Sequence, residues 1–256
     1  MKFSLKSIAA AVVMAASASA SFAAIDNGAG GNGTMFFSAW DANGSYTRSL
    51  NISIDGFQAA IATAGSFDQT WASDAVFTSF LAGANQASLQ WNIVALDNSG
   101  AYRAVDTFNT LPTTAVKDNV ARAAISNGVL FAGAANVAQG AADSLAVGTS
   151  SPAYAGLASF GNNLGNISMF NNAGSLSNSS YATGLGIARI DAKATGLNTS
   201  INTAYVDDGS AVHAWVAADG LHIAAAVAAV PEPESYAMFL AGLGMLGFMA
   251  RRNKRA

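Results

Sequence analysis

Residues 35–50 have the sequence MFFSAW-DANG-SYTRSL. Two runs of aromatic, apolar and β-branched residues flank the segment 41–44, which is typical of two strands joined by a short connection. An Asn-Gly pair is a strong signal for a tight turn that requires positive φ angles. We therefore predict an antiparallel β-hairpin, with Asn43 and Gly44 supplying the positive φ.

Residues 91–105 repeat this pattern as WNIVAL-DNSG-AYRAV. Both segments contain Asp-x-x-Gly-x-Tyr followed closely by an arginine, Arg48 in the first and Arg103 in the second. An internal duplication would explain the likeness. Alternatively, the two segments acquired these residue types independently, because hairpin turns favour them. We favour this second explanation because it needs fewer assumptions. Either origin predicts a second hairpin.

A third set of strands is predicted at 203–206, 211–216 and 221–227, separated by turns at 207–209 and 217–220.

Two histidines lie in the last of these hairpins. With 217–220 as the turn, Trp215 pairs with His222, and His213 lies on the same face. Two imidazoles beside an indole suit a metal ion or a sugar ring. Only Asp219 offers a nearby carboxylate, so we favour the simpler interpretation that these residues decorate a half-buried strand face.

Helices are predicted to be few and rich in alanine. Ser73-Asp74 caps one helix that ends near Gly83, and its apolar face contains Val76, Phe77, Phe80 and Leu81. A second begins at Thr113 or Thr114 and has Gly128 just after its end. The fold class is therefore mainly β: an antiparallel sandwich or jelly-roll-like domain with one or two short Ala-rich helices.

The stretch between Asp143 and Arg189 has about 45 residues and no charge or histidine. It is rich in Asn, Ser, Gly and Ala, so charge-driven disorder does not fit. Short strands joined by Asn/Gly turns are the favoured interpretation, and a flexible linker is the alternative.

The N-terminus has the pattern of a secretory signal peptide, residues 1–23. Lys2 and Lys6 precede an apolar run from Ile8 to Ala16, and small residues follow at the candidate cleavage sites. The Sec translocon and signal peptidase are the partners that this segment predicts.

The C-terminus, residues 230–256, combines three features in a fixed order. Prolines at 231 and 233 hold an extended backbone around Glu232. An apolar segment at 235–250 follows, with about 15 residues from Tyr236 that span roughly 22 Å as a helix. The basic cluster comes last: Arg251, Arg252, Lys254 and Arg255. By the positive-inside rule this cluster stays cytoplasmic, which predicts a single transmembrane helix with residues 24–229, the body, outside.

The tail resembles the PEP-CTERM sorting signal of Gram-negative bacteria, on the strength of Pro231-Glu232-Pro233, the Leu/Gly-rich span and the terminal basic cluster. The resemblance implies an exosortase as partner, transient membrane anchoring, processing near the Pro-Glu-Pro motif, and delivery to the cell surface or extracellular matrix. It also implies association with exopolysaccharide and biofilm. The same tail is sometimes labelled after ice-binding proteins, and we do not take that label as a function.

The body differs in composition from the whole chain. It has six basic residues and thirteen aspartates, a net charge of about −7, and contains no Glu and no Cys. A basic footprint for nucleic acid is absent, as are thiol chemistry, a Glu general acid and disulfide bonds.

The motifs in the sequence exclude most kinds of chemical site. Gly28–Gly33 matches G-x-G-x-x-G and Asp55 follows at a suitable distance, but a dinucleotide site needs a strand before the glycines and a helix after them. A flexible mature N-terminus explains the glycines better. Aspartates in the predicted turns suit Ca²⁺, but backbone hydrogen bonding at turns is the explanation we favour; they are Asp41, Asp97, Asp207, Asp208 and Asp219. We predict no catalytic, cofactor or metal residues.

We therefore expect an exported, non-enzymatic surface or matrix protein. The alternative is a carbohydrate-binding β-sandwich that uses Trp40, Trp91 or Trp215 as a platform for sugars. An ice-binding protein and an Asp-pair polysaccharide enzyme rank below these two.

Overall fold

The computed structural model describes residues 24–64, 67–111, 117–160, 173–193, 199–207 and 209–225. The predicted signal peptide, the predicted C-terminal hydrophobic helix and the sorting residues lie outside these ranges.

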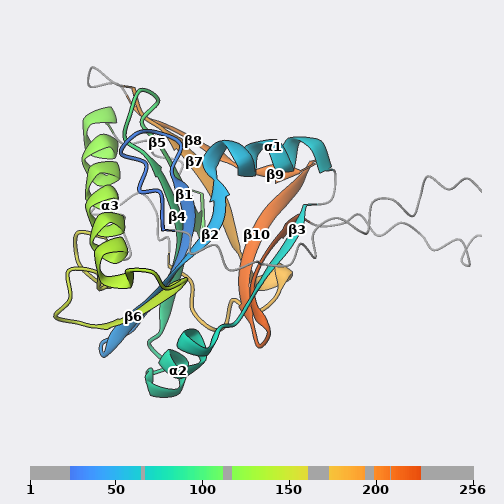
Figure 1. Cartoon of the computed structure of the whole chain (residues 1–256). Coiled ribbons are helices and arrows are strands. Elements are labelled where there is room, and N and C mark those ends of the chain that lie inside the picture. The colour runs from blue at the N-terminus through green and yellow to red at the C-terminus, as the bar shows by residue number, and fades with distance from the viewer. Residues whose placement is uncertain are drawn as a thin grey trace, which may run out of the picture.

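The described chain is mainly β and antiparallel (Figure 1). The strands are β1 Thr34–Trp40, β2 Gly44–Ser53, β3 Asp68–Ala72, β4 Gln90–Asp97, β5 Arg103–Phe108, β6 Ser144–Gly148, β7 Leu185–Asp191, β8 Ile201–Ala204, β9 Val206–Asp207, β10 Ser210–Ala217 and β11 Gly220–Ala225. They form one sheet in the order β3-β11-β10-β7-β5-β4-β1-β2-β6, with β8 beside β7 and β9 beside β10.

This sheet corrects the predicted sandwich. The strands belong to one continuous sheet that curls until its ends approach each other, rather than to two separate sheets. Side chains join strands β3 and β2, which are far apart in the strand order. The Trp71 indole N–H donates to the Leu50 carbonyl at 3.1 Å, and Arg48 Nη1 donates to the Ala72 carbonyl at 2.7 Å. Curling gives a large antiparallel sheet an enclosed apolar interior, as a second sheet would.

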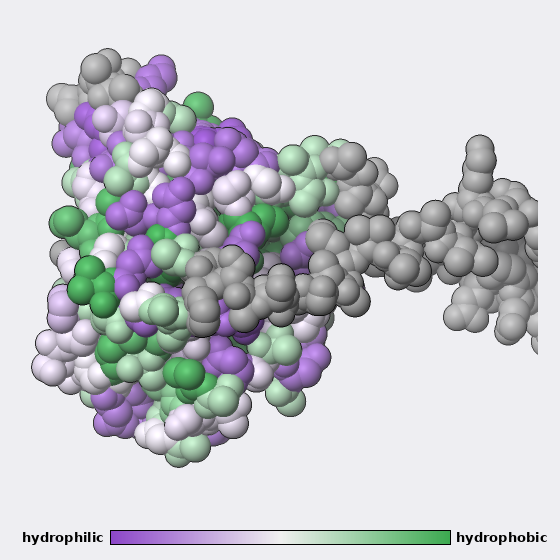
Figure 2. Space-filling model, in the orientation of Figure 1, coloured by the Kyte–Doolittle hydropathy of each residue, from purple (hydrophilic) through white to green (hydrophobic). Residues whose placement is uncertain are grey.

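Helix α3, Asp118–Gln139, covers the outer face of the sheet. Its buried side packs on Phe36, Val94 and Ala188, which come from three different strands. The helix lies at one edge of the molecule, and hydrophobic residues reach the surface on that side (Figures 1 and 2). The sheet is therefore buried on both faces where α3 crosses it.

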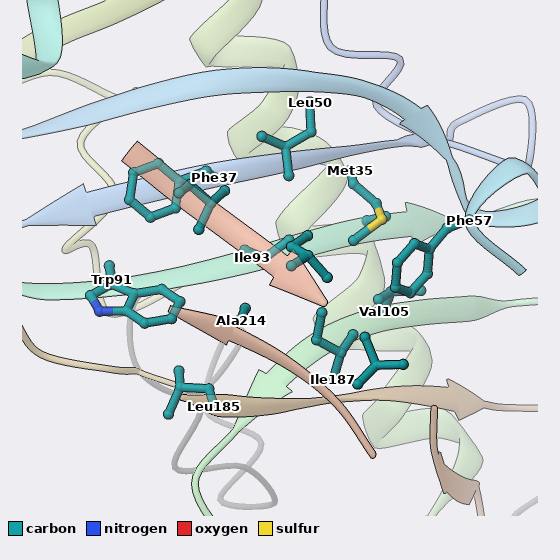
Figure 3. Close-up of a cluster of buried hydrophobic side chains, with 14 of the residues drawn as sticks. Met35, Phe37, Leu50, Phe57, Trp91, Ile93, Val105, Leu185, Ile187 and Ala214 are labelled. Carbon is teal, nitrogen blue, oxygen red and sulfur yellow. The ribbon is translucent and has the colours of Figure 1, made fainter. Parts of the chain in front are cut away.

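The inner face of the curled sheet forms a second core (Figure 3). Alternate residues of each strand point into it, so Met35 and Phe37 lie inside while Phe36 faces α3. Helices α1, Ile54–Ala64, and α2, Ala75–Gly83, contribute Phe57 and Phe77 to this inner core. Helix α1 was not predicted.

The first two predicted sets of strands are confirmed, and the third is confirmed in part: its first strand, predicted at 203–206, is divided between β8, which ends at Ala204, and β9, which begins at Val206. β1 pairs with β2, β4 with β5, and β10 with both β9 and β11. The predicted turn geometry at Asn43-Gly44 is wrong, since neither residue has a positive φ. Instead Asp41 Oδ1 accepts hydrogen bonds from both of their backbone N–H groups. A glycine is needed at 44 for space, because a Cβ there would lie 2.6 Å from the Val147 carbonyl oxygen of β6.

The predicted cap of α2 is confirmed: Asp74 accepts from the Phe77 N–H at 2.7 Å. Phe77, Phe80 and Leu81 face the inner core as predicted, but Val76 is exposed. For α3 the predicted end is wrong. Gly128 is buried inside the helix, which continues to Gln139 and stops at Gly140 with a φ of 61°. The predicted start at Thr113 or Thr114 lies outside the described residues.

The glycine-rich N-terminus is packed, which corrects the expectation of a flexible segment. Ile25 is buried, and the Asn136 side chain of α3 bonds both its N–H and its carbonyl. A Cβ at Gly28 would lie 1.8 Å from the Leu96 carbonyl oxygen, and one at Gly33 would lie 2.3 Å from it. Strand β1 follows at once, so the helix that a dinucleotide site needs is missing here.

The charge-free stretch is ordered where it is described. It supplies β6, the turns of 149–160, the short helix η2 at Tyr181–Thr183 and the start of β7. This confirms short elements joined by turns for those parts. Residues 161–172 lie outside the described ranges.

Candidate functional site

Trp215 and His222 form a stacked pair on β10 and β11. They are paired in register, as predicted, and their rings are 5.0 Å apart and nearly parallel, with an interplanar angle of 3°. Neighbouring strands place such side chains side by side on one face of the sheet. His222 and Trp215 are both half-buried.

His213 and Tyr181 form a second stacked pair next to the first. Their rings are 4.7 Å apart, and the Tyr181 ring stands perpendicular to Trp215 at 6.0 Å. The His213 Nδ1–H donates to the Tyr181 carbonyl at 2.8 Å, and the Tyr181 hydroxyl donates to the Ala211 carbonyl at 2.8 Å. Helix η2 thus supplies the tyrosine that sequence reasoning missed. We call these four residues the aromatic cluster.

His222 has polar partners at both ring nitrogens. Its Nε2–H donates to Asp219 Oδ1 at 2.8 Å, and its Nδ1 is 2.9 Å from the Thr70 hydroxyl of β3. The hydrogen bond from His222 lowers the pKa of Asp219 below its ordinary value. Both nitrogens of this histidine are therefore engaged within the protein.

We expect His222→Ala to raise the pKa of Asp219 toward its ordinary value, because the replacement removes the hydrogen bond that favours the carboxylate. Since the native pKa is depressed, the interaction stabilises the fold above the ordinary carboxyl pKa and is lost as the pH falls through the native value. The change in stability is small at so exposed a group. Carboxyl chemical shifts followed by NMR during an acid titration measure the pKa, and an unchanged value in the variant would contradict the assignment.

The geometry of the aromatic cluster favours a structural role over a flat sugar platform. The rings stack on one another across the strands, so ring faces are used inside the cluster. Within the described ranges, no three His, Asp or Glu side chains gather in a metal-binding arrangement. Trp215 and the two histidines are all half-buried.

Two of the three tryptophans expected as sugar platforms belong to the core. Trp40 is 4% exposed and Trp91 is fully buried. The Trp91 indole N–H donates to the Ser175 carbonyl at 2.9 Å, and a Cβ at Gly174 would lie 2.5 Å from the indole. The prediction failed for Trp40 and Trp91 because both faces of the sheet are covered where they lie. The alternation of residues along a strand does not indicate whether a face is covered.

The aspartates of the turns are used by the fold. Asp41 Oδ2 accepts from the Asn85 N–H at 2.6 Å, in addition to the Oδ1 contacts described above. Asp97 accepts from the guanidinium of Arg103 at 2.8 Å and is 3% exposed. Asp207 accepts from the Phe67 N–H at 2.6 Å. Asp41 and Asp97 also accept from backbone N–H groups within their own turns, Asp97 from Ser99 at 3.2 Å, as the backbone explanation expects. The Asp207 contact joins distant segments instead, and Asp208 lies outside the described residues.

A polar hollow, open to solvent and of about 620 Å³, lies where β4 begins and β5 ends. Its lining is uncharged and contains serine hydroxyls and the amides of Gln90, Asn109 and Asn178. The lining residues come from three distant segments, so sequence patterns did not indicate the hollow. Hydroxyl and amide groups of this kind hydrogen-bond polyhydroxylated ligands.

Comparison with known proteins concerns the tail. Residues 229–255 match the family model of the PEP-CTERM protein-sorting motif. The chain carries a PEP-CTERM sorting signal. This confirms the resemblance inferred from the Pro-Glu-Pro residues and the terminal basic cluster. No curated protein and no solved structure matches the chain.

The PEP-CTERM motif implies export, an exosortase as the sorting partner, and a surface or extracellular location. Pro231, Glu232 and Pro233 lie within the matched residues, together with the basic cluster, and all lie outside the described ranges. Among the described residues, no helix has the length and apolarity needed to cross a membrane. The predicted span at 235–250 belongs to the tail and stays a prediction.

Proposed function

We propose that the chain is a non-enzymatic surface or extracellular-matrix protein of a Gram-negative bacterium. The segment 235–250 anchors it transiently in the cytoplasmic membrane, and exosortase processing then delivers the body to the exopolysaccharide of a biofilm. The observation that supports this proposal is the PEP-CTERM motif at residues 229–255, placed behind a packed body with an acidic net charge.

The use of the charged groups supports a non-enzymatic role. Arg103 bridges Asp97 and Asp55 through distances of 2.8 and 2.7 Å. Asp74 caps α2 and accepts from the Tyr46 hydroxyl at 2.6 Å. Burial and this carboxylate raise the pKa of Tyr46 far above its ordinary value, so the hydroxyl keeps its proton as a hydrogen-bond donor. These charged groups therefore serve the fold.

The matrix proposal is tested by fractionating the native protein from cells that produce exopolysaccharide. We expect it to co-purify with the polysaccharide and to be released when the polysaccharide is degraded enzymatically. Recovery of the protein in freely soluble form from untreated matrix would contradict its association with the exopolysaccharide. Membrane processing is measured in the same cells and tests the sorting of the protein separately.

A carbohydrate-binding module is the second candidate, supported by the uncharged hydroxyl and amide lining of the polar hollow. Gln90 lies at this hollow, and Trp215 is the half-buried member of the three tryptophans considered above.

We expect Gln90→Ala to weaken binding to host exopolysaccharide by about tenfold, the equivalent of roughly 1.4 kcal/mol. Trp215→Ala is expected to change binding less, because its ring stacks within the aromatic cluster. Ile201→Ala, at a position 62% exposed and outside the hollow, is the matched control. Affinity electrophoresis of the full-length chain in gels containing the polysaccharide measures the effect. Equal retention of all three variants and the native chain would exclude this candidate.

A further inference from the structure

The basic residues of the body fall into two groups. Three of them, Arg48, Arg103 and Arg189, each form an ion pair with an aspartate. The other three form no ion pair with a carboxylate in the part of the chain that the structure describes; they are Lys117, Arg122 and Lys193. Cations without a carboxylate partner remain available to a ligand that carries negative charge.

Contacts with the start of helix α3 bring these three cations to one end of the molecule. Lys117 immediately precedes α3 and forms an isolated β-bridge with Thr199. Arg122, in the second turn of the helix, donates through Nη1 to the Lys193 carbonyl. Lys193 and Thr199 are therefore both held at the start of α3. Lys117 and Lys193 are exposed and Arg122 is half-buried. We call the three cations Lys117, Arg122 and Lys193 the basic site.

Tyr102 fixes one cation of the basic site in place. The guanidinium of Arg122 lies over its ring, 5.9 Å from the ring centre. Tyr102 has a φ of 47°, which bulky residues rarely adopt, and the Ala192 N–H donates to its carbonyl at 3.0 Å. Backbone strain of this kind persists only where the surrounding structure fixes it, and it is concentrated at functional sites. Because Arg122 is positioned in advance, less conformational entropy is lost when a ligand binds to it.

The aspartates next to the basic site in the chain leave it with a positive charge. Asp191 is bound by Arg189 at 2.8 Å. Asp118 is fully buried, and its single charge set against three cations leaves a surplus of two. Charges farther away than about 8 Å are largely screened at physiological ionic strength. The basic site therefore attracts anions locally, although the body as a whole is acidic.

An acidic polysaccharide is the partner that fits this site. Such a polymer carries a carboxylate on each acidic sugar, and guanidinium and ammonium groups bind carboxylates through charge-assisted hydrogen bonds. Double-stranded DNA carries one charge per about 1.7 Å, so the acidic remainder of the body would repel it more strongly. We propose that the basic site binds the carboxylates of an acidic polysaccharide. The inference rests on the proposed matrix association and names the class of polysaccharide and the residues that hold it.

Affinity electrophoresis with two defined polymers tests the proposal. The full-length chain is expressed in exporting cells, and the exported protein is run in gels that contain either polygalacturonate, a polymer of uronic acid, or neutral dextran. We expect retention by polygalacturonate alone, and we expect added salt to abolish it. Lys117→Gln combined with Lys193→Gln is expected to weaken the binding by about tenfold, because two exposed charge contacts are lost.

Leu130→Glu combined with Val137→Glu is the matched control. It lowers the net charge by the same two charges, at positions of α3 that are 72% and 87% exposed. These positions lie about 12 and 22 Å from Arg122 along the helix axis, beyond the reach of unscreened charge. Retention of this control is expected to equal that of the native chain. Thermal unfolding of both double variants shows whether they are folded.

The other outcomes overturn the proposal. Equal weakening in the two double variants would show that net charge, rather than the basic site, governs binding. Absence of retention by polygalacturonate at low salt, or equal retention by dextran, would exclude an acidic polysaccharide as the ligand. Binding to DNA or to vesicles of anionic lipid, without retention by polygalacturonate, would assign the site to another partner.

Failure of the matrix proposal gives a different pattern of results. In that case polygalacturonate still retains the native chain and the double lysine variant still binds less, but the native protein is recovered in soluble form from untreated matrix. Co-purification with the exopolysaccharide in the absence of retention by polygalacturonate has the opposite meaning, since the matrix association then holds and the basic site does not provide it.

Discussion

Deletion of Tyr236–Ala256 is expected to abolish membrane retention and processing of the full-length chain. The deletion removes the apolar segment and the basic cluster of the PEP-CTERM signal. Without about 15 consecutive apolar residues the tail cannot enter the hydrocarbon core, and without the basic residues nothing holds its end in the cytoplasm. Fractionation into membrane, periplasm and medium, with the mass of each species, measures the outcome.

A second variant separates anchoring from cleavage. Replacement of Pro231, Glu232 and Pro233 by alanine leaves the apolar segment intact, so this chain is expected to stay in the membrane at its unprocessed mass. The described body is unchanged in both variants, and its thermal unfolding serves as the control for folding. A deletion variant that fractionates like the native chain would contradict the assigned role of the tail.

Asp41→Ala is expected to lower the free energy of unfolding by roughly 3–4 kcal/mol, because hydrogen bonds to a charged acceptor are lost and buried donors stay unpaired. Asp41 is 3% exposed. Its carboxylate accepts from the N–H groups of Asn43, Gly44 and Asn85, which ties the first hairpin to the connection between α2 and β4. Urea unfolding followed by tryptophan fluorescence measures the change.

The electrostatics of Asp41 give this prediction a pH dependence. Burial alone would raise the pKa of Asp41, but the hydrogen bonds from Asn85, Asn43 and Gly44 outweigh it and lower the pKa. The stabilisation is therefore present above the ordinary carboxyl pKa of 3.8 and is lost as the pH falls through the lower native value. Asp219→Ala, at a side chain that is 68% exposed, is the matched control and should change stability little. Equal losses in both variants would contradict the role assigned to Asp41.

Local patterns predicted the hairpins well. Residues 35–50 and 91–105 form β1-β2 and β4-β5, because short-range alternation and turn residues act between neighbours in the chain. The same reasoning located α2 through the Asp74 cap. It failed in two places: α3 continues through Gly128, and helix α1 was not predicted, although it buries Ile54, Phe57 and Ile61 on one face in the inner core.

The candidate sites divide in the same way. The pairing of Trp215 with His222 follows from hairpin register, so the sequence predicted it. Tyr181 reaches His213 from a segment 32 residues away, and the polar hollow combines three distant segments, so neither could be predicted from spacing. From the sequence, Trp40 and Trp91 suited the surface as well as Trp215 did. In the folded chain both are buried, because the two faces of the curled sheet are covered.

The sequence by itself determined that this protein carries a PEP-CTERM sorting signal, because the tail is a linear signal that can be read without the fold. It also determined the mainly β character, through contacts between residues close in the chain. Only the tertiary structure decided that one sheet curls on itself, that the glycine-rich N-terminus packs against β4, and that Leu130 and Val137 of α3 stay exposed. These features depend on which distant surfaces meet, because burial is a property of the whole packed chain rather than of any segment.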